Sequence, residues 1–218
     1  MSGKVAAIIL AAGESRRMGR PKPLLPWGKT TVLGQVVSVF AAAGIEEIVV
    51  VTGGARAQVE GLVTELAREF PVRAAHNPNY ANGGMLSSIQ RGLQDLPQPP
   101  PSLRDTSPKS FGFGGGWERV SALIALGDQP QVREETVRRI CAAYRQNTSP
   151  LVVPSFNQRR GHPWLVDRGL WPEILALPPA TTPQQFLRAH AGQVEYVPAD
   201  ESILQDLDTP EDYQRHRP

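Results

Sequence analysis

The chain has 218 residues, of which 40% are hydrophobic and 20% charged, so it can bury a core of ordinary size and a fully disordered protein is excluded. Its formal net charge of +2 is spread along the sequence, which gives no support to a nucleic-acid partner. Cys141 is the single cysteine, so an intrachain disulfide and a cysteine zinc cluster are excluded, and its apolar helical surroundings predict a buried thiol. This length fits one domain over residues 1–218.

Strand-like and helix-like segments alternate along the chain. Apolar, β-branched runs predict strands, and apolar residues at helical spacing predict helices. In chain order the expected elements are strand Val5–Leu10, helix Thr31–Ala43, strand Glu47–Thr52, helix Arg56–Phe70, strand Val72–His76, helix Met85–Leu96, strand Arg119–Leu126, helix Glu134–Tyr144, strand Pro150–Pro154, a hairpin over Gln158–Val166 and two shorter helices. This alternation predicts an α/β fold with a mostly parallel sheet and right-handed crossovers.

Two segments bear on location and on organisation. The first apolar run, Val5–Ala12, is too short to span a bilayer and is followed at once by charged residues without a cleavage region. We therefore expect a strand, no membrane segment and a cytoplasmic protein. Residues 97–118 are rich in proline, serine and glycine and predict an inserted surface loop, which is either a lid over a ligand or a passive loop.

The turn after the first strand combines glycines with cations. Glycine turns expose backbone N–H groups that bind phosphate oxygens, and neighbouring cations strengthen that binding. The P-loop pattern fails because its leading glycine would fall at Pro23, and the dinucleotide fingerprint fails because Gly13 and Gly19 are too far apart. The segment indicates a polyphosphate-binding loop; the alternative is an ordinary turn with solvated arginines. Its cations are Arg16, Arg17, Arg20 and Lys22.

Two aspartates are candidate metal ligands. Asp128 follows an apolar strand and a glycine, so it should lie at the same edge of the sheet as the glycine turn. A carboxylate facing bound phosphates calls for a cation between them, and Mg²⁺ is commonly held by one or two carboxylates with phosphates; the alternative is a turn aspartate. Asp208 would supply a second carboxylate. Thr209 beside it predicts a helix N-cap, completed by Asp212, which explains this segment without a role for Asp208.

Together these residues resemble the MobA-like nucleotidyltransferase superfamily, and within it the molybdenum cofactor cytidylyltransferases. The resemblance implies a three-layer, Rossmann-like sheet of the glycosyltransferase-A type, with helices on both faces and a small C-terminal hairpin and helix region. The matching segments are Leu10–Gly13, Ser15, Arg17–Gly19, Pro21–Lys22, Leu24–Pro26, Asn77–Pro78, Gly84–Met85, Ser87–Ser88, Gly92–Leu93, Gly127–Pro130, Gly161–Pro163 and Asp206–Asp212.

The resemblance also implies a role for each matching residue. The catalytic residues would be Arg17 and Lys22, which bind the phosphates, and Asp128, which holds Mg²⁺ together with Asp208. His162 would lie on the acceptor side; the alternative is a polar residue in a tight hairpin. The nucleotide-binding residues implied are Leu10, Ala11, Ala12, Gly13 and Gly19 with Lys22 around the triphosphate, and Gly84 and Ser88 at the base.

The activity implied is Mg²⁺-dependent transfer of CMP from CTP to a phosphorylated acceptor, the molybdopterin cofactor, with release of pyrophosphate and delivery of the product to a molybdoenzyme or its chaperone. The Ala-Ala-Gly form of the first loop is similar to the cytidylyl branch, although sugar-nucleotide pyrophosphorylases share it. The chain departs from the family in its long insert and at 180–186, where an acidic and basic pair is missing. Alternatives are transfer to a sugar phosphate, a non-catalytic nucleotide sensor and, despite the missing fingerprint, a dinucleotide-dependent oxidoreductase.

Overall fold

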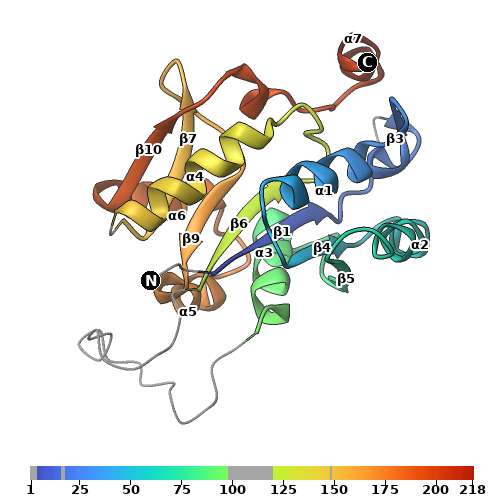
Figure 1. Cartoon of the computed structure of the whole chain (residues 1–218). Coiled ribbons are helices and arrows are strands. Elements are labelled where there is room, and N and C mark those ends of the chain that lie inside the picture. Colours follow the sequence, from blue (N-terminus) through green and yellow to red (C-terminus); the bar gives the residue numbers. More distant parts are fainter. Residues whose placement is uncertain (1–3, 16–17, 98–119, 148) are drawn as a thin grey trace.

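The computed structural model describes residues 4–15, 18–97, 120–147 and 149–218, and in them a mixed sheet lies between two layers of helices (Figure 1). The order of strands is β10-β7-β9-β6-β1-β4-β5, with β8 paired to β7. Neighbours are parallel except for β9, which is antiparallel to β6 and β7, and for β8. The strands are β1 Lys4–Ala11, β4 Ile48–Thr52, β5 Val72–His76, β6 Val120–Leu126, β7 Leu151–Phe156, β8 Arg159–Arg160, β9 Trp164–Asp167 and β10 Val194–Pro198; β2 Pro26–Trp27 and β3 Thr30–Thr31 form a separate ribbon.

Helices cover both faces because the central strands are apolar on both sides. Ile9 of β1 packs in the cluster that holds α1, α2 and α4, whereas the adjacent Ile8 packs in the cluster that holds α3, α5 and α6. Strands buried on both faces read as continuous apolar runs. The three-layer α/β fold expected from the sequence is therefore confirmed. The helices are α1 Val32–Ala42, α2 Arg56–Leu66, α3 Gly84–Asp95, α4 Glu134–Gln146, α5 Trp171–Ala176, α6 Pro183–Ala189 and α7 Pro210–His216, with short 3₁₀ turns η2 Lys22–Leu24, η4 Arg168–Leu170, η5 Ala191–Gln193 and η6 Glu201–Leu204.

The order in which the chain adds strands to the sheet reverses between β1 and β6. From β1 the chain builds outward through β4 and β5, then returns to place β6 on the other side of β1. Leu10 lies beside Leu126 in the parallel register, and the Gly127 N–H donates to the Leu10 carbonyl at 2.9 Å. Open α/β sheets bind ligands at such a switch point, outside the carboxyl ends of the strands. The loop after β1 and Asp128 after β6 both leave the sheet there.

One expected element is wrong. A hairpin over Gln158–Val166 does not form; β8 instead pairs back onto β7, and β9 enters the main sheet between β6 and β7. The turn lies at Asn157 and Gln158, both with positive φ (47° and 63°), as two-residue hairpin turns that match the strand twist require. The expected insert at 97–118 lies outside the described residues from residue 98 onward.

Two expectations from composition can be compared with the structure. Cys141 is buried in α4, and burial raises the pKa of its thiol to about 11, so it stays protonated. In the described part of the chain, none of the helices has the length and apolar character that crossing a membrane needs.

Candidate functional site

The loop after β1 is anchored at the neighbouring strand end. Ala12 is buried, and its carbonyl accepts from the Gly54 N–H at 3.2 Å. A Cβ on Gly53 would lie 2.4 Å from that carbonyl oxygen, so the close approach needs a glycine. Gly13 is exposed, and among the described residues beyond its chain neighbours no atom lies within 4 Å of where its Cβ would be; Gly19 has a positive φ of 66°. The loop thus presents exposed backbone beyond a fixed base; Arg17, expected here, lies outside the described residues.

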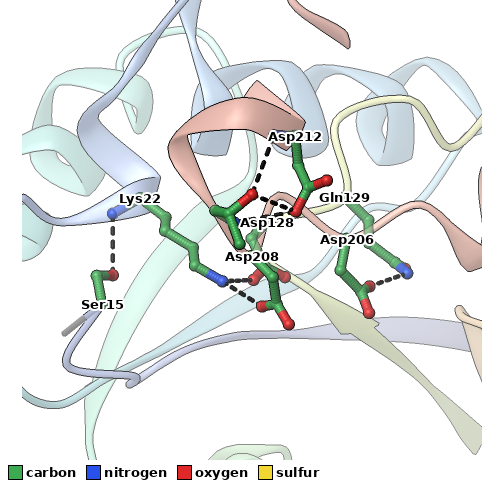
Figure 2. Close-up of polar contacts among 8 residues, drawn as sticks. Ser15, Lys22, Asp128, Gln129, Asp206, Asp208 and Asp212 are labelled. Carbon is green, nitrogen blue, oxygen red and sulfur yellow. Dashed lines mark hydrogen bonds and ion pairs between the residues drawn. The ribbon is translucent and has the colours of Figure 1, made fainter. Parts of the chain in front are cut away.

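Lys22 closes this loop and reaches back to the sheet. Its backbone N–H donates to Ser15 Oγ at 3.0 Å, which fixes the start of η2. Its ammonium Nζ contacts Asp128 Oδ2 at 2.8 Å and Asp208 Oδ1 at 2.7 Å (Figure 2). Burial opposes the charged form, but attraction to Asp128 and then Asp208 outweighs it and raises the pKa of Lys22. Two carboxylates that are 80 positions apart in the sequence therefore meet on one cation. We call Lys22, Asp128 and Asp208 the Lys22 cluster.

Burial of a neighbouring leucine brings Asp208 to this place. Leu207 is fully buried in a small cluster with Leu25, Trp27 and Val32, and its N–H donates to the Asp128 carbonyl at 3.2 Å. On the other side of Asp208, Thr209 caps α7 through the capping box expected from the sequence. Asp208 is thus held between a buried residue and a helix start, and it is not a member of the cap.

Gln129 and Asp206 were not singled out from the sequence, although both lie beside the Lys22 cluster. The Gln129 side chain is buried, and its Nε2 donates to Asp206 Oδ1 at 2.6 Å and to the Ile203 carbonyl at 3.3 Å. Burial, followed by the negative charge of Asp128 and of Asp208, raises the pKa of Asp206. The sequence signal was a glutamine directly after Asp128, just beyond the end of an apolar strand.

The donor set of the cluster fits a hard divalent cation. Asp128 and Asp208 offer carboxylate oxygens, already share one positive charge and keep exposed side-chain fractions of 25% and 46%. Mg²⁺ prefers oxygen ligands and is commonly held by one or two carboxylates with phosphates and water. Within the ranges that the structure describes, no group of three or more histidine, cysteine or acidic side chains is placed to hold a metal ion. The two aspartates would therefore hold the ion together with a phosphate ligand.

The residues expected at the base lie at the start of α3. Gly84 is exposed and has a positive φ of 58°. Ser88 is buried, and its Oγ accepts from Asn77 Nδ2 at 3.0 Å. Asn77 also donates to Ser87 Oγ at 2.9 Å, so it fastens the start of α3 to the end of β5. The sequence motif contained Asn77 but gave no reason to assign it this positioning role.

His162 lies in the loop between β8 and β9, against η6. Its backbone N–H donates to the Ile203 carbonyl at 3.3 Å, the same oxygen that the Gln129 side chain contacts. A Cβ on Gly161 would lie 2.3 Å from that oxygen, so this approach needs a glycine. Burial lowers the pKa of His162 to about 4, and its Nε2 has no hydrogen-bond partner among the described residues. His162 is therefore a neutral imidazole linked to the Lys22 cluster through η6.

The geometry can be compared with known proteins. Residues 7–194 match the model of the MobA-like NTP transferase domain. The chain belongs to this family. Its first loop, Asp128 and the sheet edge between β1 and β6 all fall within the matched residues, whereas Asp208 lies beyond them. The resemblance expected from the sequence is thus confirmed for the family.

Two relatives that match nearly the whole chain are named for different reactions, an oxidation–reduction and a cytidylyl transfer. Nicotine blue oxidoreductase of Paenarthrobacter nicotinovorans is 31% identical over 97% of this chain and 95% of its own. Molybdenum cofactor cytidylyltransferase of Escherichia coli K12 is 26% identical over 96% of this chain and 93% of its own. Among solved structures, Rv0371c of Mycobacterium tuberculosis has a TM-score of 0.74 at 26% identity, covering 98% of this chain and 97% of its own. A complex of Rv0371c with manganese has a TM-score of 0.68 at 25% identity, covering 99% and 98%.

Proposed function

We propose that this protein transfers CMP from CTP to a phosphorylated acceptor, the molybdopterin cofactor, and releases pyrophosphate. The observation that carries the proposal is the Lys22 cluster itself, in which one cation and two carboxylates meet at the switch point beside the glycine loop. Membership of a nucleotidyltransferase family supports the reaction class. The molybdenum cofactor cytidylyltransferase supports the acceptor, and its match extends over nearly the whole chain.

The main obstacle to this reaction is repulsion between two anions. An acceptor phosphate oxygen would attack the α-phosphorus in line, and the bond to the leaving pyrophosphate would break. Asp128 and Asp208 would hold Mg²⁺, and the bound ion would neutralise part of the negative charge on the phosphates. Lys22, together with Arg17, would stabilise the leaving pyrophosphate, and exposed N–H groups of the first loop would orient the triphosphate.

No general base is required, because an acceptor phosphate is already ionised near neutral pH. The titratable groups outside the cluster agree with this. Burial lowers the pKa of His162 to about 4, which makes it a weak proton acceptor, and Cys141 is a protonated thiol within α4. We therefore assign His162 to contact with the acceptor and not to proton transfer. We also propose a cytoplasmic reaction, where nucleoside triphosphates are available, one domain over residues 1–218, and delivery of the product to a molybdoenzyme or its chaperone.

A second candidate is oxidoreduction of nicotine blue. The observation that favours it is the 31% identity to nicotine blue oxidoreductase across 97% of the chain. The first loop counts against it, since Gly13 and Gly19 do not have the spacing of the dinucleotide fingerprint. The Lys22 cluster also has an evident use with a triphosphate, whereas hydride transfer needs no paired carboxylates.

A pyrophosphate-release screen tests the proposal. CTP, GTP, ATP and UTP are each combined with molybdopterin cofactor, with a sugar 1-phosphate or with no acceptor, in the presence of Mg²⁺ or Mn²⁺. We expect release with CTP and molybdopterin that Asp128→Ala removes, while the exposed Glu211→Gln retains it. Release with a sugar phosphate alone would reassign the acceptor. Tight CTP binding without release would indicate a sensor, and turnover of nicotine blue without any release would overturn the proposal in favour of the second candidate.

A further inference from the structure

The ammonium of Lys22 lies where the proposed metal ion would have to bind. It contacts Asp128 Oδ2 at 2.8 Å and Asp208 Oδ1 at 2.7 Å, while its own side chain is only 14% exposed. Both carboxylates therefore already have a cation as their partner. A second cation bound by the same two carboxylates would be repelled by the ammonium at close range.

The backbone around Lys22 is restrained, whereas its side chain is free to change conformation. The backbone N–H is bonded to Ser15 Oγ at 3.0 Å, and prolines on both sides, Pro21 and Pro23, restrict the backbone. Pro23 is also buried. The four-carbon stem is flexible, however, and an ammonium is a point charge that exchanges one set of oxygens for another without a fixed orientation. Figure 2 shows this stem running from the fixed backbone to the two carboxylates.

We propose that Lys22 is an exchangeable counter-ion: its ammonium neutralises Asp128 and Asp208 when the site is without nucleotide, and moves to the nucleotide phosphates when a divalent ion enters. The inference rests on the proposed function, because it takes the two aspartates as metal ligands and a triphosphate as the ligand of the loop. It adds an order to binding. The metal ion binds poorly to the protein alone and well together with nucleotide, since the phosphates give the ammonium a new partner.

Such an exchange couples two binding events. If nucleotide strengthens metal binding by some factor, the metal strengthens nucleotide binding by the same factor. The coupling should depend on the charge of Lys22, because the ammonium is what the metal must displace. A fixed structural ion pair predicts the reverse for the metal: loss of Lys22 would disturb the position of Asp208 and weaken the site.

Mn²⁺ binding to the full chain, followed by electron paramagnetic resonance of the free ion, separates these outcomes without measuring activity. Titrations are run with and without a non-hydrolysable CTP analogue on wild type, Lys22→Met and Lys22→Gln. The glutamine retains hydrogen-bond donors for the carboxylates, so it serves if the methionine variant does not fold. Lys29→Met is the matched control, because it removes the same charge from an exposed position on the turn between β2 and β3.

Without nucleotide, we expect Lys22→Met and Lys22→Gln to bind Mn²⁺ at least about tenfold more tightly than wild type, the factor that one displaced charge-assisted hydrogen bond represents. Lys29→Met should behave as wild type, and adding Asp208→Asn to either Lys22 variant should remove the gain. Nucleotide should strengthen Mn²⁺ binding most in wild type.

Unchanged or weaker Mn²⁺ binding in both Lys22 variants, with nucleotide-dependent binding still intact in wild type, would overturn the exchange while the proposed function stands. Absence of Mn²⁺ binding from wild type even with the CTP analogue would instead remove the metal site, and with it both the exchange and the proposed function.

Discussion

The Lys22 cluster and the Gly161–Pro163 turn, which packs against Ile203 of η6, are built on different physical principles. The cluster joins charged groups from distant parts of the chain, with aspartate side chains that remain 25% and 46% exposed. The turn holds a neutral, half-buried His162 with a buried Nε2, and its backbone is fixed on the Ile203 carbonyl. Gln129 links the two, because it donates to that same carbonyl and to Asp206.

The two regions differ in what holds them: ion pairs hold the Lys22 cluster, and close packing holds the turn. In the Lys22 cluster, partly exposed carboxylates can exchange one ionic partner for another at modest cost, which suits a site that receives and releases charged ligands. In the turn, a close backbone contact at Gly161 and a buried ring leave little freedom. Substitutions in the cluster should therefore change turnover more than stability, and substitutions in the turn should change stability more than turnover.

The largest effect is expected for Asp128→Ala. Losing one of two carboxylates at the proposed metal site should lower turnover at least about a hundredfold, in the range observed when a group that stabilises transition-state charge is removed. The measurement is pyrophosphate release at saturating Mg²⁺, with circular dichroism to verify folding. A folded variant with full activity would refute the assignment of Asp128 to the metal.

Lys22→Ala should have the next largest effect. We expect turnover to fall at least about tenfold, since a charge-assisted hydrogen bond to the transition state contributes roughly 1.5–3 kcal/mol. Removing the exposed Lys29 instead should leave turnover unchanged, because it is not part of the cluster. Wild-type turnover in Lys22→Ala would exclude the lysine from catalysis and leave it as a structural counter-ion.

The sequence predicted one half of the cluster better than the other. Asp128 follows a continuous apolar strand, so strand order alone places it at the switch point. Asp208 depends on burial of Leu207 and on its bond to the Asp128 carbonyl, which are tertiary contacts with no local pattern. The pairing of Lys22 with both aspartates was also not expected, because the phosphate loop had suggested phosphates as its partners.

The same distinction holds for the fold. The buried parallel strands were found because their apolar runs are continuous, and Val72–His76 was predicted with its observed bounds. The edge strand β10 was missed, since Glu195 is only half-buried and Tyr196 is exposed, so no apolar pattern marks it. The hairpin turn was misplaced because Asn157 and Gln158 adopt positive φ without a glycine to indicate it.

Gln129→Ala should have an intermediate effect, through the position of Asp208. The variant removes the Gln129 donor from Asp206, while the Ile203 carbonyl keeps the backbone N–H of His162. We therefore expect a stability loss of roughly 1–3 kcal/mol and a several-fold rise in the Mg²⁺ concentration for half-maximal rate. The KM for CTP should change less. Chemical denaturation and a Mg²⁺ titration measure these effects.

A donor exchange tests whether Gln129 acts by positioning. Gln129→Glu alone places two carboxylates together and should raise the Mg²⁺ requirement as well. Adding Asp206→Asn restores an amide-to-carboxylate hydrogen bond in the opposite direction. The double variant should therefore need less Mg²⁺ for half-maximal rate than Gln129→Glu does. If the double variant is no better than Gln129→Glu, the hydrogen bond does not position the cluster.

The smallest effect on turnover is expected at His162, where the signal should instead appear in stability. Its pKa is about 4 in the folded protein against an ordinary 6.5, so the unfolded chain takes up a proton first as pH falls. Folding stability should therefore decrease as pH drops from 6.5 toward 4, by on the order of 1–2 kcal/mol at pH 5. In His162→Gln this contribution disappears, and the difference in unfolding free energy between pH 7.5 and pH 5 should shrink accordingly. An unchanged difference, measured by urea denaturation at both pH values, would mean that the imidazole is solvated and able to carry charge, which would remove the contrast with the Lys22 cluster.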